Sequence, residues 1–174
     1  TDLPDPGIPH VLRGWNLAGG PAEHYLDLGE MLVRNVPTDV RTYDGTDRRR
    51  DGNSIFVFEV GGLCIGHLGH LHHEPSAEQY AALGRLDVVM APVDGGYTVP
   101  LPVMIRVLER LRSSVVIPMH WFGSASLERF IEGMAGSFAI ERPGTAHYEV
   151  SLRSLPSRPT VVVLRPRPLE DPSL

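Results

Sequence analysis

The sequence contains a single cysteine, Cys64, among 174 residues, so no disulfide can form within the chain. None is needed, because a chain of this length buries about 70% of the surface that it exposes when unfolded. The contents of 42% hydrophobic and 21% charged residues are typical of an ordinary globular protein. We therefore expect one domain over residues 1–174, with a loosely held proline-rich tail over 166–174. The neighbours of Cys64 are apolar, so we expect it in the core and not as a nucleophile.

Lysine is absent, since all sixteen basic residues are arginines, and the formal net charge is -5. This balance excludes a general surface for nucleic acid or for an anionic membrane, which needs clustered positive charge. The basic run at 48–50 is flanked by Asp44, Asp47 and Asp51 and is interpreted as a solvated loop. Long apolar runs are also missing, and none approaches the roughly 20 residues that cross a bilayer. We therefore expect a soluble protein.

Apolar periodicity and turn residues predict the regular elements. Gly61 and Gly62 separate two apolar segments and predict a hairpin, and the strands on either side of the helix at 100–112 predict a parallel strand–helix–strand unit. Residues 37–53 are polar and rich in turn formers, which predicts a long loop. The predicted strands cover 11–13, 31–36, 54–60, 63–67, 87–93, 115–120, 138–141 and 160–164, and the predicted helices cover 76–83, 100–112 and 126–135. The fold class is therefore α/β or α+β.

Four of the eight histidines fall within seven residues, where an apolar strand runs out into a loop: His67, His70, His72 and His73. Neutral imidazole is the commonest protein ligand for zinc and also suits iron, copper and nickel. The cluster therefore predicts a metal site to which at least two of the four histidines contribute. The alternative is a polar turn that faces the solvent.

His120 is a candidate ligand from a distant part of the sequence, because it ends the apolar strand at 115–120. If this strand end lies at the same sheet edge as the histidine cluster, His120 can complete the site. The alternative is a packed core histidine beside the aromatic residues that follow it. His10, His24 and His147 lie in polar or Pro/Gly-rich surroundings and are predicted at the surface.

A series of short motifs follows through the middle of the chain: Asn53-Ser54-Ile55-Phe56-Val57-Phe58-Glu59, Gly62-Leu63, His67-Leu68-Gly69, Asp87-Val88, Pro92-Val93, Tyr97-Thr98 and Ile117-Pro118-Met119-His120. In this order they resemble the C-terminal half of the metallo-β-lactamase fold superfamily, in particular its bacterial metal-dependent hydrolases. The resemblance implies part of an αββα sandwich, with mixed sheets and flanking helices. It also implies a site at one sheet edge with two metals, often zinc, that activate water for hydrolysis.

The resemblance assigns His120 to the last histidine ligand of the family and His70 to the position of the aspartate that usually bridges the two metals. His67 and His73 match histidines that are common around this turn. A histidine cannot bridge two metals as a carboxylate does. The departure at His70 therefore favours a histidine-rich site with a single metal.

Two further family features have no counterpart in this sequence. The family has a histidine in the loop before the first motif, where residues 37–53 contain none and Tyr43 or Asp44 is nearest. The leading motif "H-x-H-x-D-H" is also absent, and Thr1 stands at the point that would follow it. Half a sandwich would expose a large apolar face. We therefore expect that an N-terminal segment, a second chain or a homo-oligomer completes the fold and the metal site.

Asp94 and Tyr97 lie in the loop after a central strand, where the family places groups that orient the ligands or face the substrate. Asp94 can orient a ligand histidine. The alternative for this segment is an ordinary glycine turn.

These observations lead to two hypotheses. The first is a bacterial metal-dependent hydrolase, with zinc as the first choice of metal and iron, nickel or manganese as others, acting on a small-molecule ester, lactone, amide or phosphodiester. The second is a non-catalytic metal-binding or scaffold protein with a degenerate site. Under either hypothesis, the sequence is compatible with a protein of the cytoplasm or of the periplasm.

Overall fold

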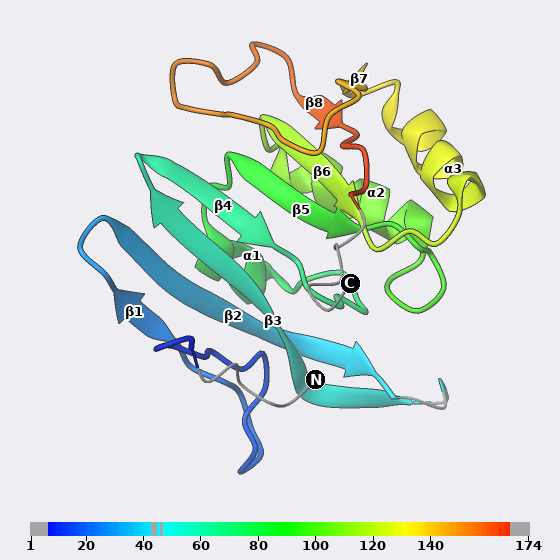
Figure 1. Ribbon diagram of the computed structural model, residues 1–174. Coiled ribbons are helices and arrows are strands. Elements are labelled where there is room, and N and C mark those ends of the chain that lie inside the picture. The colour runs from blue at the N-terminus through cyan, green and yellow to red at the C-terminus, as the bar shows by residue number, and fades with distance from the viewer. Residues whose placement is uncertain (1–6, 43–44, 46, 168–174) are drawn as a thin grey trace, which may run out of the picture.

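The computed structural model describes residues 7–42, 45 and 47–167. These residues form one mixed sheet of eight strands, in the order β1-β2-β3-β4-β5-β6-β8-β7, together with three helices (Figure 1). The strands are β1 (Tyr25–Asp27), β2 (Met31–Arg41), β3 (Arg48–Val60), β4 (Leu63–His67), β5 (Val88–Pro92), β6 (Val115–Met119), β7 (Ala139–Glu141) and β8 (Thr160–Val162). The helices are α1 (Ala77–Leu83), α2 (Leu101–Leu111) and α3 (Ser124–Met134). The α/β class and the flanking helices predicted from the sequence are confirmed.

The first half of the sheet is antiparallel, and its longest hairpin corrects one prediction. Residues 37–53 are not a long loop, because β2 continues to Arg41 and β3 begins at Arg48. The outer part of this hairpin carries mostly polar residues and lacks the apolar alternation by which a half-buried strand is recognised. The arginines of the basic run 48–50 are exposed, as expected, but they begin β3.

Three other predictions for this part of the chain had different outcomes. Residues 11–13 lie in the described part of the chain and are not in a strand, so that prediction is wrong. Tyr43 and Asp44 lie outside the described residues. The hairpin around Gly61 and Gly62 is confirmed, with β3 and β4 paired antiparallel.

The second half of the sheet is parallel, and it follows the predicted strand–helix–strand unit. β4 pairs with β5, β5 with β6, and β6 with β8, all in the parallel sense. The helix α1 begins after Ser76, whose side chain accepts a hydrogen bond from the Gln79 N–H, and the Gln79 side chain bonds back to Ser76 N. This reciprocal capping box satisfies two backbone donors at the helix start. α3 begins at Ser124, two residues before the predicted position.

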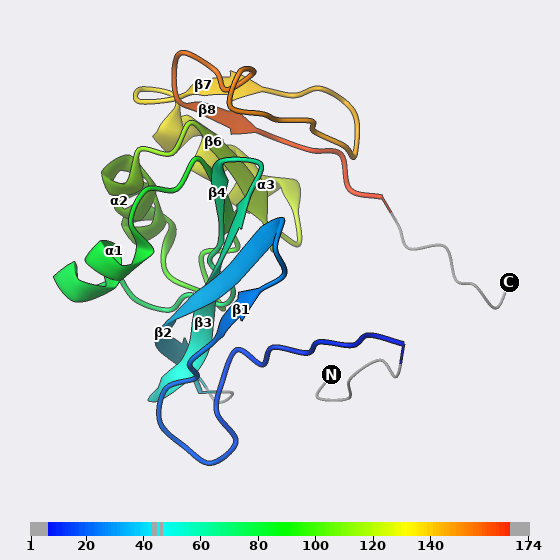
Figure 2. The same ribbon diagram turned by 90° about the vertical axis from the view of Figure 1, so that its left-hand side faces the viewer.

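All three helices pack on one face of the sheet and enclose the main core. Figure 2 shows α1 and α2 on one side of the sheet, and the N-terminal segment on the other. The strands contribute alternate residues to this core, such as Ile55 and Val57 of β3 and Val89 of β5, and the helices contribute Met104 and Phe130. Within the described residues, no helix is long and apolar enough to span a bilayer.

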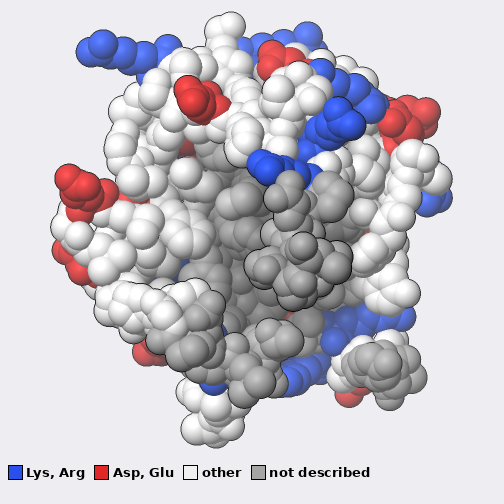
Figure 3. Space-filling view, in the orientation of Figure 1, with Lys and Arg blue, Asp and Glu red and all other residues white. Residues whose placement is uncertain are grey.

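The opposite face of the sheet is covered unevenly. A second cluster around Val88, Val115 and Val162 is covered by Tyr148 and Leu155 from the segment between β7 and β8. In Figure 3, the charged side chains visible on this side lie mostly toward the rim.

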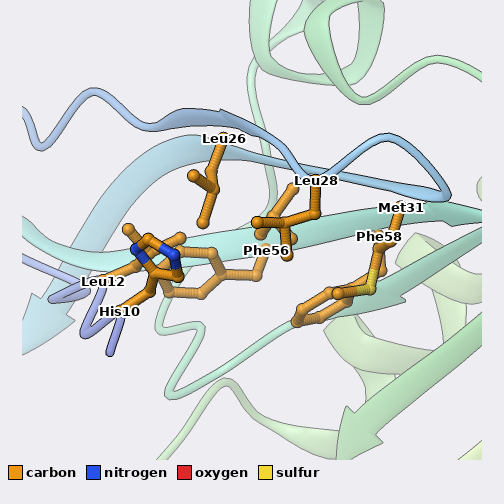
Figure 4. A pocket seen from close by; sticks show the side chains of 8 residues that line it. His10, Leu12, Leu26, Leu28, Met31, Phe56 and Phe58 are labelled. Atoms are coloured by element: carbon orange, nitrogen blue, oxygen red, sulfur yellow. The ribbon is translucent and has the colours of Figure 1, made fainter. Parts of the chain in front are cut away.

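An apolar groove of about 290 Å³ lies over β1, β2 and β3 (Figure 4). It is lined by His10, Leu12, Leu26, Leu28, Met31, Val33, Phe56 and Phe58. Leu28 at this groove is almost half exposed. The groove is thus an exposed apolar surface on the face of the sheet that the helices leave open.

Arg34 connects the antiparallel half of the sheet to α1. Its guanidinium donates hydrogen bonds to the Glu59 carboxylate at 2.8 Å and to the carbonyl oxygens of Ala82 and Leu83 at 2.7 and 2.9 Å. We expect Arg34→Met to lower the free energy of unfolding by about 1.5–3 kcal/mol, because hydrogen bonds of a half-buried charged group are lost. Urea unfolding followed by circular dichroism measures this change.

Arg106 offers the matched control, because its guanidinium lies 3.3 Å from the Glu74 carboxylate with both side chains well exposed. We expect Arg106→Met to lower the free energy of unfolding by less than about 1 kcal/mol. Equal losses in the two variants would contradict the assigned role of Arg34.

Candidate metal site

His70 and His120 come together at the carboxyl ends of the parallel strands. β4 ends at His67, three residues before His70, and β6 ends at Met119, directly before His120. The two Nε2 atoms are 2.8 Å apart, and the rings meet edge to face with centroids 4.4 Å apart. The two histidines are separated by 50 residues in sequence, so the parallel sheet produces this contact.

Asp94, which follows β5, holds the other side of the His120 ring. Its Oδ2 atom is 3.1 Å from His120 Nδ1. Since an ionised carboxylate only accepts hydrogen bonds, Nδ1 carries the proton, and in the neutral ring the Nε2 atom of His120 keeps its lone pair. His70 Nε2–H then donates to His120 Nε2. A carboxylate on the far nitrogen is the arrangement that orients metal-binding histidines in proteins.

The Asp94 carboxylate is itself held in a fixed position. It accepts hydrogen bonds from the backbone N–H groups of Gly96, Tyr97 and Thr98 and from the Thr98 hydroxyl. Burial alone would raise the pKa of Asp94, but these four hydrogen bonds outweigh it and hold the pKa well below its usual range. Asp94 is therefore a carboxylate at every physiological pH.

The backbone of His120 has an unusual conformation. Its φ angle is +53°, in the left-handed region that residues other than glycine seldom adopt. Such conformations persist where the surrounding structure fixes them and are concentrated at functional sites. At His120 this turn ends β6 and directs the chain toward α3.

Asn53 positions His70 from the neighbouring strand β3. Its side-chain oxygen accepts the His70 N–H at 2.8 Å, and its amide nitrogen donates to Thr38 Oγ1 at 2.7 Å and to the Leu68 carbonyl at 3.2 Å. Gly69 has a φ angle of +60° and passes so close that a Cβ atom there would lie 2.3 Å from Asn53 Oδ1. The turn that carries His70 therefore depends on a buried amide and on a residue without a side chain.

The remaining three histidines of the cluster have other environments. His73 Nδ1 is 2.8 Å from the Glu74 carbonyl, to which it donates, and Nε2 accepts the Asp39 N–H at 3.1 Å, so both ring nitrogens are engaged. His67 Nδ1 accepts the Gly69 N–H at 3.1 Å. His72 Nδ1 is buried and has no hydrogen-bond partner within the described part of the chain.

Burial keeps several of these imidazoles in the neutral form. It lowers the pKa of His67, although a backbone hydrogen bond acts in the opposite direction. Burial and the neighbouring His120 lower the pKa of His70, and Asp94 acts against them. Burial and then Arg41 have the same lowering effect on the pKa of His72. Neutral imidazole is the form that binds metal ions.

The prediction that the other three histidines lie at the surface is confirmed for two of them. His10 and His147 are exposed, whereas His24 is half-buried, stacked on Phe56 and bonded through Nε2 to the Arg13 carbonyl at 2.7 Å. None of the three was expected to bind metal.

Tyr97 and Phe122 stand at the rim of the site. The Tyr97 side chain is directed outward and meets the Phe122 ring edge to face, with ring centroids 5.8 Å apart. The role of Phe122 was not predicted from the sequence, and neither was that of Asn53. Asn53 did give a signal, since it is a polar residue directly before the predicted strand at 54–60.

The His70–His120 pair suits a metal ion as part of a ligand set. Two imidazole nitrogens on one tetrahedral zinc, each about 2.0–2.1 Å away, lie roughly 3.3–3.4 Å from each other. The observed 2.8 Å separation is that of a hydrogen bond, so a small parting of the two rings would admit an ion. Among residues 7–42, 45 and 47–167, no group of three or more His, Cys, Asp or Glu is arranged to hold a metal.

Comparison with known protein families agrees with this arrangement. The family described as the beta-lactamase superfamily domain matches residues 1–120, which is more than half of the chain. The chain belongs to this superfamily. The match includes both histidines of the pair and Asp94.

Curated relatives of this superfamily member are metal-dependent hydrolases by name. One from Thermoplasma acidophilum is 27% identical over 119 residues, which are 64% of this chain and 51% of that protein. Another from Thermoplasma volcanium is 28% identical over 94 residues, which are 53% of this chain and 40% of that protein. The chain thus matches about half or less of the length of these relatives.

Solved structures show the same fold. A Thermotoga maritima protein, described as a candidate Zn-dependent hydrolase of the metallo-beta-lactamase superfamily, superposes with a TM-score of 0.62 at 27% identity, over 84% of this chain and 70% of that one. A candidate metal-dependent hydrolase from Parabacteroides distasonis has a TM-score of 0.50 at 15% identity, over 64% of this chain and 50% of that one. At that identity the second likeness concerns the fold alone. The resemblance predicted from the sequence motifs is confirmed.

Proposed function

We propose that this chain carries half of the metal site of a hydrolase, with His70 and His120 as metal ligands. The observation that carries this proposal is the 2.8 Å approach of their Nε2 atoms, with Asp94 on the far nitrogen of His120. His70 and His120 would hold a zinc ion, which would supply a nucleophile at neutral pH because zinc lowers the pKa of bound water. Iron, nickel and manganese remain alternatives to zinc, because imidazole ligands do not choose among them.

The residues of this chain have separate tasks in the proposal. Asp94 fixes the ring orientation and the tautomer of His120, so that Nε2 presents its lone pair. Asn53 fixes the backbone at His70. His70 can also present a lone pair on Nε2 if its proton moves from Nε2 to Nδ1. This change of tautomer leaves the ring neutral. The substrate is a small molecule with an ester, lactone, amide or phosphodiester bond.

The relatives are named as metal-dependent or Zn-dependent hydrolases. These names support both the hydrolase assignment and the presence of a metal. Zinc sites use three or four protein ligands, and this pair supplies two. His67 and His72 are the next candidates within the chain, since neither is engaged at both ring nitrogens by the hydrogen bonds of the described residues. His73 would first have to give up its two hydrogen bonds. The other source of ligands is an N-terminal segment, a second chain or a second copy that completes the fold.

A second candidate is a non-catalytic metal-binding or scaffold protein. It is favoured by the absence of a third metal-holding side chain from the group around His70 and His120 in the described residues. It also agrees with a histidine at the position where the family usually has a bridging carboxylate. Metal content and turnover distinguish the two candidates.

The test is elemental analysis of the purified protein beside His70→Ala and His120→Ala. We expect wild type to retain a transition metal and each variant to lose it, because one of two converging nitrogen donors is removed. His147→Ala is the control, since His147 is exposed and should leave the metal content unchanged. Metal retained in both site variants would refute the assignment of the pair as ligands.

Turnover is then measured on ester, lactone, amide and phosphodiester substrates with wild type loaded with zinc. Hydrolysis of one class that disappears in His120→Ala supports the hydrolase. Bound metal without turnover of any class supports the metal-binding or scaffold protein.

A further inference from the structure

Tyr97 and Phe122 form a continuous row of rings with the histidine pair. The Phe122 ring meets the His120 ring edge to face with centroids 4.9 Å apart, and the Tyr97 ring meets Phe122 in the same way at 5.8 Å. The His120 ring in turn contacts His70. We call the Tyr97 and Phe122 side chains the aromatic wall.

The aromatic wall is unusual because it is apolar and exposed. Tyr97 is 67% exposed and Phe122 is 74% exposed. Single exposed aromatic residues are common on protein surfaces, whereas two in contact beside a candidate metal pair form an apolar surface that a ligand can cover. Aromatic side chains contribute large contact areas when a ligand covers them.

The backbone that carries Tyr97 is held by the same contacts that hold the site. The Tyr97 N–H donates to Asp94, whose other oxygen orients His120. On the opposite side, the Arg41 guanidinium donates to the Gly96 carbonyl, which ties this loop to the β2–β3 hairpin. Phe122 follows His120 by two residues and lies three residues beyond the end of strand β6. Because the loop backbone at Tyr97 is fixed in this way, ligand binding there costs less conformational entropy than binding to a mobile loop would.

We propose that the aromatic wall binds an aromatic or branched aliphatic group of the substrate, next to the bond that the histidine pair's metal would cleave. This inference rests on the proposed function and narrows its substrate class. The wall comprises only two side chains and leads directly to the His120 ring, so its size fits one substituent of a small molecule. The polar part of the same molecule would then face His70 and His120.

The experiment uses phenylacetate and acetate, which share a carboxylate and differ by one phenyl ring. Binding is followed by NMR shifts of backbone amides during titration of the zinc-loaded protein. We expect wild type to bind phenylacetate at least tenfold more tightly than acetate. In Phe122→Ala this ratio should fall below threefold, with acetate binding unchanged, and Phe122→Tyr should restore it because a ring is present again.

Tyr25→Ala is the matched control, because Tyr25 is 75% exposed but lies on edge strand β1, away from the row of rings. We expect it to keep the wild-type ratio. An unchanged ratio in Phe122→Ala, or an equal loss of acetate and phenylacetate binding, would overturn the proposal. Self-association of wild type that Phe122→Ala abolishes, without any preference for phenylacetate, would show a protein interface and would also overturn it.

Titration with benzyl alcohol distinguishes a failure of this proposal from a failure of the proposed function on which it rests. It has the ring but no metal-binding carboxylate, so its titration reports on the aromatic wall whether or not metal is bound. Benzyl alcohol shifts confined to the amides near Tyr97 and Phe122, in a protein that binds no metal, would support the wall and refute the metal site. Metal binding with no benzyl alcohol shifts near the wall would refute the wall alone.

Discussion

Gly69→Ala is expected to lower the free energy of unfolding by roughly 2–4 kcal/mol. Two effects add at this position. The φ angle of +60° lies in the left-handed region, which costs a residue with a Cβ atom about 1–2 kcal/mol. The added Cβ would also lie 2.3 Å from Asn53 Oδ1 and 3.1 Å from the Ser54 carbonyl oxygen, so the buried hydrogen bond from His70 N–H to Asn53 must break or shift. Urea unfolding measures the loss.

Gly61→Ala separates the two effects. Gly61 has nearly the same φ angle, +58°, and a Cβ atom there would meet nothing within 4 Å. It should therefore show the backbone cost alone, about 1–2 kcal/mol. The difference between the two variants is the cost of displacing Asn53. Equal losses would mean that Asn53 adapts freely, and the turn at His70 would then not depend on it.

Displacement of Asn53 should also affect the geometry of the metal site. The Asn53 side chain fixes the His70 N–H, so a shifted Asn53 lets the His70 ring move away from His120. We therefore expect Gly69→Ala to lose metal affinity as well as stability, whereas Gly61→Ala should keep the wild-type affinity. Competition with a chelator measures both.

Asp94→Asn is expected to weaken metal binding by about 10–100-fold, the usual cost of removing the hydrogen-bond partner of a ligand histidine. An asparagine oxygen could still accept the backbone N–H groups of residues 96–98, but its NH₂ group would then face the Thr98 hydroxyl and His120 Nδ1–H. Two donors facing each other repel, so the His120 ring must turn or change tautomer. Chelator competition measures the affinity.

NMR of the imidazole nitrogens gives a second measurement that needs no metal. We expect the Nδ1–H tautomer of His120 in wild type and its loss in Asp94→Asn. Asp87→Asn is the matched control, because Asp87 is also a buried aspartate beside β5, where it accepts the Cys64 N–H at 2.8 Å. It should lose stability but keep the metal affinity and the His120 tautomer. Unchanged metal affinity in Asp94→Asn would remove Asp94 from the site.

The parts of the fold that were predicted correctly are those with a local pattern. The helix α2 and the strands β5 and β6 on either side were recognised because an amphipathic stripe lies between two short apolar runs. The outer β2–β3 hairpin was missed because its strands carry mostly polar residues and show no apolar alternation. Its pairing is decided by the neighbouring strand and not by its own sequence.

The candidate site divides in the same way. The cluster His67–His73 and the strand end at His120 were visible as residue types at strand ends, and the superfamily resemblance connected them. That His70 alone of the cluster contacts His120, while His73 bonds the backbone at Asp39 and Glu74, could not be read from spacing. The contact of Phe122 with Tyr97 was missed for the same reason, because the two residues lie in different loops.

The sequence by itself determined the element types and the placement of histidines at the ends of strands, because these depend on backbone preferences and on side-chain periodicity over a few residues. Tertiary structure alone decided which of those histidines meet. Parallel pairing sets β4 against β5 and β5 against β6 in fixed register, with His67 opposite Met90 and Pro92 opposite Met119. That register delivers His70, Asp94 and His120 to one edge, and no local signal encodes it, because it results from packing between residues far apart in the chain.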